Sequence, residues 1–160
     1  MGRATKRLSG RAAVPRSSTV KRLVIFMLAG FAMSASASEH FEEGQVWRYN
    51  TRAGEESSQL YIVQIDAHEK LGLIYHIALD GLKLKNPQIE GGLQTELSHL
   101  PIDEAALQAS VTQLLSENVP MPDISEGYGH WKAVFDAGEG GVFNIPAEQV
   151  VGYIEEIVNQ

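Results

Sequence analysis

Cysteine is absent from all 160 residues of this chain. Its absence excludes disulfide bridges, thiol nucleophiles and the lipid-modified cysteine of a bacterial lipoprotein. An exported protein without disulfides is more typical of a bacterial envelope than of a small extracellular scaffold held together by disulfides.

Positive charge is scarce beyond residue 37. Seven of the 13 lysines and arginines lie in residues 1–37, whereas all 20 aspartates and glutamates follow. Residues 38–160 therefore hold six basic and 20 acidic side chains, a net charge of −14, against −7 for the whole chain. Nucleic acids and anionic membrane surfaces are bound through lysine and arginine, so neither is an expected partner. The acidic surplus indicates either a solvated surface or a basic partner.

The sequence also lacks the motifs of common catalytic and metal sites. Its serines beyond residue 37 stand in neither a G-x-S-x-G nor an S-x-x-K pattern. The histidines show neither H-x-H nor H-E-x-x-H spacing: they are His40, His68, His76, His99 and His130. The glycines of 137–143 follow an expected helix instead of preceding one, which indicates helix termination and not a phosphate cradle. We therefore expect no metal and no cofactor.

Residues 1–37 have the features of a secretory signal peptide. Lys21 and Arg22 precede an apolar run from Leu23 to Met33, and small residues follow, with cleavage expected after Ala37. This run is too short for a membrane anchor, because a helix needs about 20 residues to cross a bilayer. We expect export, to the periplasm or alternatively out of the cell, with no membrane span after cleavage.

The basic, polar residues 1–19 are unusual in front of such a segment. If the codon of Val20 initiates translation, the chain begins directly with a compact signal peptide. We therefore hypothesise that the start at Met1 is mis-assigned, and a Val20 codon that cannot initiate would refute this.

Residues 38–160 are long enough for one domain with an ordinary core. Alternating or β-rich segments predict strands at 45–52, 59–66, 73–79, 82–85 and 95–100. Helical spacing of apolar residues then predicts helices at 101–118, 125–138 and 146–160, with Asp103 and Ser125 as N-caps. This order predicts an α+β fold: an antiparallel meander of about four to five strands, followed by three helices packed on one face of the sheet.

The dipeptide Asp-Gly at 80–81 is a strong hairpin signal, because both central residues of a type I′ turn need positive φ. A two-residue loop would pair Leu79 with Leu82 and His76 with Lys85. It would place the aliphatic side chains on one face and those of His76 and Lys85 on the other, which supports this register.

Four of the six basic residues beyond residue 37 project from two predicted strands: Arg48 and Arg52 from the first, Lys83 and Lys85 from the fourth. If these faces coincide, they form with His76 a cationic face for an anionic ligand or an acidic loop of a partner. The alternative is that the long side chains cover an exposed sheet face and pair with nearby acids.

Tyr128, Trp131 and Phe135 recur at helical spacing in the second predicted helix. A stripe of this kind is most often part of a core. An exposed stripe would instead contact a partner.

Three segments resemble a group of small exported bacterial proteins without an assigned activity: GQVWRYNTRAGEESS, HIALDGLKLKNP and EGYGHWKAVFDAGEGGVF. The resemblance covers Phe41 to about Ile157. It implies that these segments belong to one domain, and it assigns no functional residue.

The sequence favours a non-catalytic exported protein that binds another macromolecule, which would be a protein or another component of the envelope. An inhibitor, an immunity-like protein and an envelope accessory factor all fit a small, acidic single domain. The alternative is a small hydrolase or ligand-binding module in which His76 or His130 works with a nearby carboxylate. A third hypothesis is a structural component that self-assembles.

Overall fold

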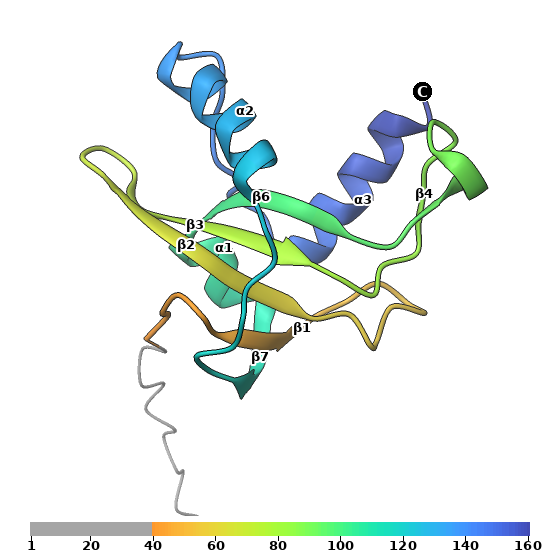
Figure 1. The fold of residues 1–160 in the computed structure, drawn as a ribbon, viewed down its shortest axis with the longest axis horizontal. Coiled ribbons are helices and arrows are strands. Elements are labelled where there is room, and N and C mark those ends of the chain that lie inside the picture. The colour runs from red at the N-terminus through yellow and green to blue at the C-terminus, as the bar shows by residue number, and fades with distance from the viewer. Residues whose placement is uncertain (1–39) are drawn as a thin grey trace, which may run out of the picture. The chain divides into compact units, whose positions relative to one another are not determined.

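The structure, a computed structural model, describes residues 40–160 (Figure 1). The signal peptide predicted for residues 1–37 lies outside this range. Within the described range, no helix combines the length and the apolar composition that crossing a membrane requires.

Most strands come first along the described chain, and two helices end it. In order they are β1 (Val46–Tyr49), β2 (Leu60–His68), β3 (Gly72–Leu79), β4 (Leu84–Lys85), a 3-10 helix (Glu90–Gly92), β5 (Leu93–Gln94), β6 (Leu97–Asp103), α1 (Glu104–Ser110), β7 (Val111–Ser116), α2 (Ser125–Asp136) and α3 (Ala147–Val158). Five strands form an antiparallel sheet in the order β6-β3-β2-β1-β7, and β4 pairs with β5 separately. The predicted α+β class, with an antiparallel sheet and three helices, is confirmed.

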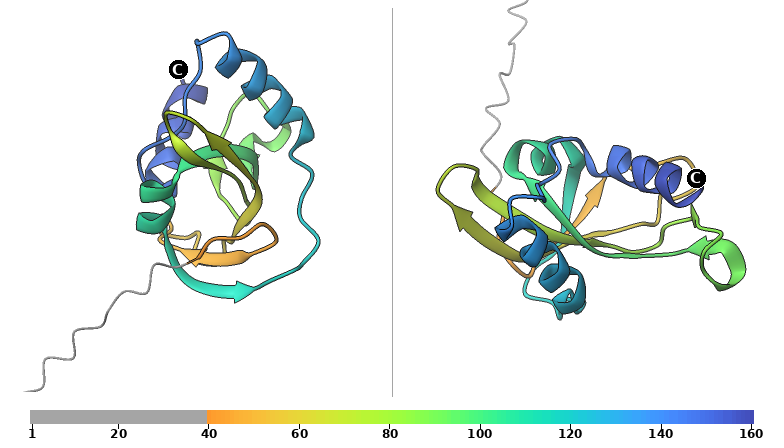
Figure 2. Two further views of the ribbon diagram at one scale, coloured as in Figure 1. Left: turned by 90° about the vertical axis from the view of Figure 1, so that its left-hand side faces the viewer. Right: turned by 90° about the horizontal axis from the view of Figure 1, so that it is seen from above.

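The apolar core lies between one face of the sheet and the helices α1 and α3. A single buried cluster joins β2, β3, α1 and α3 through Ile62, Tyr75, Ile77, Leu107 and Val150. Of the three helices expected on one face, α2 differs, because its side chains contact the opposite face of the sheet. The left view of Figure 2 shows α1 and α3 on one side of the sheet and α2 on the other.

Strand β2 contains a bulge that changes which of its residues face the core. Ile62 lies opposite Ile77, but the next paired residue, Gln64, lies opposite His76. Val63 is therefore an extra residue in β2. Because successive residues of a strand point to opposite faces, this extra residue turns Gln64 and every second residue after it away from the core.

The hairpin predicted around residues 80–81 does not form. Strand β3 pairs with β2 and β6, so Leu79 lies opposite Leu97. His76 does not lie opposite Lys85, because β4 pairs only with β5 among the described strands.

The turn at Asp80 and Gly81 leads the chain out of the sheet. Gly81 has a φ of 61°, and a Cβ there would lie 3.0 Å from the Cα of Ser58. The Asp80 carboxylate accepts a hydrogen bond from the Gln59 N–H at 2.9 Å. The dipeptide therefore has the expected positive φ at glycine, but tertiary contacts with residues 58–59 decide the path that follows.

The helix predicted for residues 101–118 is shorter than expected. Asp103 caps it as predicted, since its carboxylate accepts a hydrogen bond from the Ala106 N–H at 2.8 Å. However, α1 ends at Ser110, and Val111–Ser116 forms β7 against β1. Strand β7 begins with Val111 and Thr112, two β-branched residues that favour an extended strand once a partner strand is present.

The ends of α2 and α3 differ in detail from the prediction. Ser125 lies inside α2 and does not cap it; its N–H donates to the Asp123 carboxylate at 2.9 Å. The predicted end of α2 near Gly138 is confirmed, and this glycine has a φ of 76°. In α3, Val150 is buried as expected, whereas Ile157 is 49% exposed.

Candidate functional site

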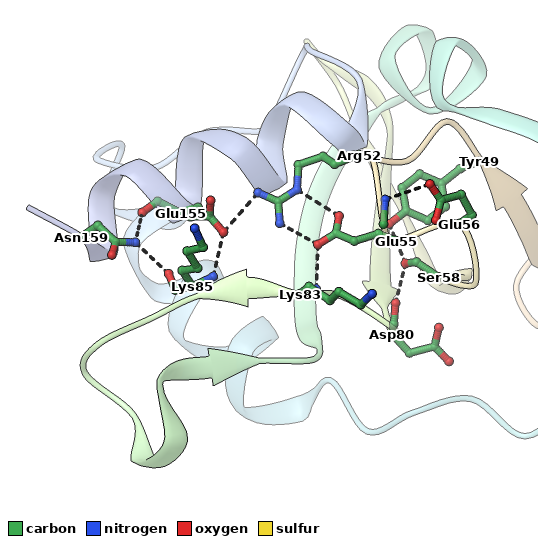
Figure 3. Close-up of polar contacts among 11 residues, drawn as sticks. Tyr49, Arg52, Glu55, Glu56, Ser58, Asp80, Lys83, Lys85, Glu155 and Asn159 are labelled. Carbon is green, nitrogen blue, oxygen red and sulfur yellow. Dashed lines mark hydrogen bonds and ion pairs between the residues drawn. The ribbon is translucent and has the colours of Figure 1, made fainter.

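Three residues of the predicted cationic face gather around two glutamates (Figure 3). The Arg52 guanidinium donates to both carboxylate oxygens of Glu55, at 2.9 and 2.6 Å, and lies 3.3 Å from the Glu155 carboxylate. The backbone N–H groups of Lys83 and Lys85 donate to Glu55 and Glu155 respectively, each at 2.7 Å. This network ties the loop after β1 to β4 and α3.

The charges of Arg52 and Glu55 are satisfied within the fold. The side chain of Glu55 is only 2% exposed. Burial opposes its charge, but the bonds from Arg52 and from the Lys83 N–H outweigh burial and keep the pKa of Glu55 below its usual value. The hydrogen bonds to Glu55 also raise the pKa of Arg52. Arg52 therefore follows the alternative stated from the sequence, in which the basic side chains pair with nearby acids.

Arg48 and His76 are not part of this network. Strand β1 ends at Tyr49, so Arg52 lies beyond the strand that carries Arg48. Arg48 is exposed and lies opposite Gln113 of β7. His76 is fully buried within β3. The structure thus brings Arg52 close to the backbone of β4 but does not unite all five predicted residues.

His76 is the centre of a polar cluster beneath α2. Its Nε2 lies 3.2 Å from Oδ2 of Asp66, and its Nδ1 lies 3.0 Å from Nε2 of His99. The Asp66 carboxylate also accepts hydrogen bonds from the Gln64 amide at 2.9 Å and from the Tyr128 hydroxyl at 2.8 Å. Four elements, β2, β3, β6 and α2, therefore contribute to one hydrogen-bonded group.

Strand register creates this cluster. The extra residue Val63 turns Gln64 and Asp66 towards the face that His76 occupies. Pairing of β6 with β3 places His99 on the same face. The contacts of His76 with Asp66 and His99 join residues 10 and 23 positions apart. Spacing along the sequence contains no signal for them.

The hydrogen bonds determine where the protons of the two histidines lie. An ionised carboxylate only accepts, so Nε2 of His76 carries a proton, and its Nδ1 accepts from Nε2–H of His99. Burial, with a smaller contribution from His76, lowers the pKa of His99 to about 4. Burial also lowers the pKa of His76, although Asp66 acts in the opposite direction. Both imidazoles are therefore neutral at pH 7.

Asp66 remains ionised in this surrounding. Burial alone would raise its pKa, but the hydrogen bonds from Gln64 and Tyr128, together with His76, lower it. The hydrogen bond to Asp66 in turn raises the pKa of Tyr128. The cluster thus contains one negative charge and two neutral imidazoles.

Aromatic side chains of α2 cover the histidines. The ring centroid of His76 lies 4.9 Å from that of Tyr128 and 4.7 Å from that of Trp131. Trp131 also stacks on Phe135 at 4.7 Å and donates its indole N–H to the Gly141 carbonyl at 2.8 Å. The three aromatic residues are half-buried. The predicted stripe therefore packs on a polar cluster, neither within the apolar core nor fully exposed.

Helix α2 approaches the sheet closely at Gly127. A Cβ at this position would lie 2.6 Å from the Cβ of His99, a separation that real Cβ atoms do not show. At Gly129, one half-turn later, a Cβ would meet nothing within 4 Å. Gly127 therefore allows the first turn of α2 to rest on β6.

An acidic hollow of about 400 Å³ lies further along β3, on the side of the sheet that α2 covers. Three carboxylates and no basic side chain line it: the lining residues are Tyr61, Ala78, Leu79, Asp80, Glu96, Leu97, Ser98, Pro122 and Asp123. The Tyr61 hydroxyl donates to Asp80 at 2.7 Å, and burial together with this bond raises the pKa of Tyr61 to about 12. Glu96 and Asp123 are exposed.

Sequence reasoning singled out His76 and His130 but missed Asp66 and His99, the actual partners of His76. His130 is exposed and lines a shallow groove with His99. Within residues 40–160, no three histidines, aspartates or glutamates are placed to hold a metal ion. Comparisons with protein-family models, curated proteins and solved structures found no match to this chain.

Proposed function

We propose that this protein is an exported, non-catalytic binding protein of the bacterial envelope that holds a basic segment of another macromolecule. The acidic hollow supports this proposal most directly, because three carboxylates and no basic side chain line it. The location rests on the signal peptide predicted for residues 1–37, with the periplasm as the simplest destination.

The charge balance of the fold supports the same proposal. Of the six basic residues beyond residue 37, Arg52 and Lys132 already pair with carboxylates. A lysine or arginine of a partner that enters the hollow would meet the carboxylates of Asp80, Glu96 and Asp123. Complementary charge accelerates association and selects against acidic partners. An inhibitor, an immunity-like protein or an accessory factor with a basic target fits this behaviour.

The proposal is tested with residues 38–160 and a short oligolysine peptide, by isothermal titration calorimetry. The double variant Glu96→Gln, Asp123→Asn removes two charges from the hollow and keeps an acceptor for the Ser125 N–H at the start of α2. We expect this variant to bind the peptide about tenfold more weakly, because two charge pairs of up to about 1 kcal/mol each are lost.

A matched control separates the hollow from the overall charge. Glu90→Gln with Glu139→Gln removes the same charge from exposed positions outside the hollow. We expect this control to change the affinity less than about twofold. Equal weakening by both double variants would show that only net charge matters and would refute the hollow as a binding site.

A second candidate function is a small hydrolase or ligand-binding module. The chain of contacts from Asp66 through His76 to His99 favours it, because an aspartate that orients a histidine is a recurrent catalytic arrangement. His76 has no exposed surface, so His99 would be the group that meets a substrate. Hydrolysis of a chromogenic ester that disappears in His99→Gln would support this candidate over the binding protein.

A further inference from the structure

Helix α2 is attached to the sheet by contacts that depend on the histidine pair. None of its residues is buried, in contrast to α1 and α3. Tyr128 and Trp131 rest on the ring of His76, and Gly127 rests on His99. The protonation state of the two imidazoles therefore affects how strongly α2 binds to the sheet.

Only one hydrogen atom can lie between the two histidine nitrogens that face each other. Nδ1 of His76 and Nε2 of His99 are 3.0 Å apart, and one of them must accept the hydrogen that the other donates. If both rings are fully protonated, two N–H groups and two positive charges face each other across this distance.

A single added proton is also unfavourable while α2 is docked. The nitrogen of His99 that remains free in the neutral pair is Nδ1, and this atom lies near Gly127 in the first turn of α2. The N-terminus of a helix carries a partial positive charge, which repels an imidazolium placed against it. Protonation of His99 therefore places a positive charge next to the N-terminus of α2, which is itself partially positive.

The other ionisable groups around the pair do not cancel this effect. Asp66 of β2 attracts positive charge, but burial of His76 outweighs this attraction and keeps the pKa of His76 below its usual value. From α2, Lys132 adds positive charge and is paired with Asp136, whereas Glu126 in the first turn is exposed, so that solvent screens its negative charge. Two further histidines lie at the margins: His68 of β2 contacts Phe135, and His130 of α2 lines the groove next to His99.

We propose that protonation of the His76–His99 pair releases α2 from the sheet, so that the protein carries a built-in response to acid. The rest of the fold stays intact, because the apolar core and the helices α1 and α3 lie on the other face. The aromatic side chains Tyr128, Trp131 and Phe135 then become accessible to solvent.

The direction of the response follows from proton linkage. Docking lowers the pKa of both histidines, that of His99 to about 4, whereas an unperturbed histidine has a pKa of about 6.5. Between these values the released state binds more protons than the docked state, so docking is favoured above this range and weakens as the pH falls through it. Each linked proton increases the ratio of released to docked molecules by up to about tenfold per pH unit.

Release of α2 would also alter the acidic hollow. Pro122 and Asp123 form part of its wall and directly precede α2. We expect binding of a basic segment to weaken when α2 leaves the sheet. This consequence rests on the proposed binding function, whereas release itself rests only on the histidine cluster.

The experiment follows the two indole N–H signals of residues 38–160 by ¹H–¹⁵N NMR, without any peptide, from about pH 7.5 to about pH 4.5. Trp131 reports on α2 through its bond to Gly141, and Trp47 reports on the core through its bond to Gln45. We expect the Trp131 signal to change with a midpoint that matches the titration of the His76 and His99 rings, while the Trp47 signal stays in place. An unchanged Trp131 signal, or simultaneous loss of both signals, would refute the switch.

A variant links the transition to the histidines. His99→Gln keeps an amide that can donate to His76 but removes one titrating group. We expect the Trp131 transition to become less steep. Per pH unit, the ratio of released to docked molecules should change by up to about tenfold less than in the native protein. An identical midpoint and steepness would refute the assignment. If the variant does not fold, the comparison of Trp131 with the ring titrations in the native protein still decides the question. The oligolysine affinity, measured separately, tests only the coupling to the hollow.

Discussion

Glu55 is the side chain in the network of Figure 3 whose loss we expect to matter most. Glu55→Ala leaves the Arg52 guanidinium without its bidentate partner and the Lys83 N–H without an acceptor. Removing one partner of a buried ion pair is strongly destabilising, and the remaining contact of Arg52 with Glu155 moderates the loss. We expect the free energy of unfolding in urea to fall by about 2–4 kcal/mol.

The adjacent residue is the natural control. Glu56 is exposed, and its carboxylate accepts hydrogen bonds from backbone N–H groups, among them that of Gly54. Glu56→Ala should therefore destabilise much less, and equal losses from the two variants would contradict the structural role of Glu55. Because the pKa of Glu55 is lowered by folding, its stabilising effect is present at neutral pH and is lost as the pH falls through the folded value.

At this scale, the sequence predicts residues whose role depends on near neighbours. Asp103 caps α1 and Gly138 lies just beyond α2, and both roles are visible from local patterns. The partners of His76 are not, since Asp66 and His99 reach it only through strand pairing. Residue types alone cannot show that a histidine flanked by apolar residues meets a carboxylate across a sheet.

Within α2, replacement of two glycines by alanine is expected to have opposite effects on the free energy of unfolding. Gly127→Ala places a Cβ 2.6 Å from His99, so α2 must move away from β6. We expect a loss of about 1–3 kcal/mol in the free energy of unfolding, because overpacking outweighs the helix propensity of alanine. The NMR signal of the Trp131 indole should also shift at neutral pH, as it does in the native protein at acidic pH if α2 is released there.

Gly129→Ala is the matched control for this clash. Its Cβ meets nothing within 4 Å, so alanine should stabilise α2 by up to about 1 kcal/mol. Urea unfolding of both variants checks the pair. A gain at both positions would contradict the close contact of Gly127 with His99.

The element that the sequence mispredicts most clearly is the segment after Ser110. Leu107, Val111 and Leu114 have the spacing of one helical face, yet only Leu107 lies in α1. The last two belong to β7, where pairing with β1 satisfies the backbone and overrides the helical period. Strands β2 and β3, in contrast, are predicted well because their β-rich sequences and their pairing agree.

For the whole molecule, the charge imbalance has a measurable effect. Residues 38–160 carry six basic and 20 acidic side chains, and such an excess destabilises a compact chain by self-repulsion. Added sodium chloride screens this repulsion, so we expect the Tm of residues 38–160 to rise with salt at neutral pH. The variant Glu90→Gln, Glu139→Gln should show a smaller rise. A Tm that falls with salt would indicate that attractive pairs such as Arg52–Glu55 dominate.

The global properties are those that the sequence predicts best, because class, size and charge are sums over many residues. The α+β class with an antiparallel sheet is confirmed, while the placement of α2 opposite α1 and α3 was not foreseen. That placement depends on which face of the sheet is polar, and the bulge at Val63 breaks the sequence alternation that would indicate this face.

The bulge at Val63 determines how this chain tolerates changes in length. Deletion of Val63 would remove the bulge and let Gln64 follow Ile62 directly, with His76 still opposite Gln64. Ile65 and Asp66 would then keep the faces of the sheet that they occupy now. Deletion of Ile65 would instead turn Asp66 towards the apolar face, so we expect the loss of a residue to be tolerated better at the bulge than elsewhere in β2.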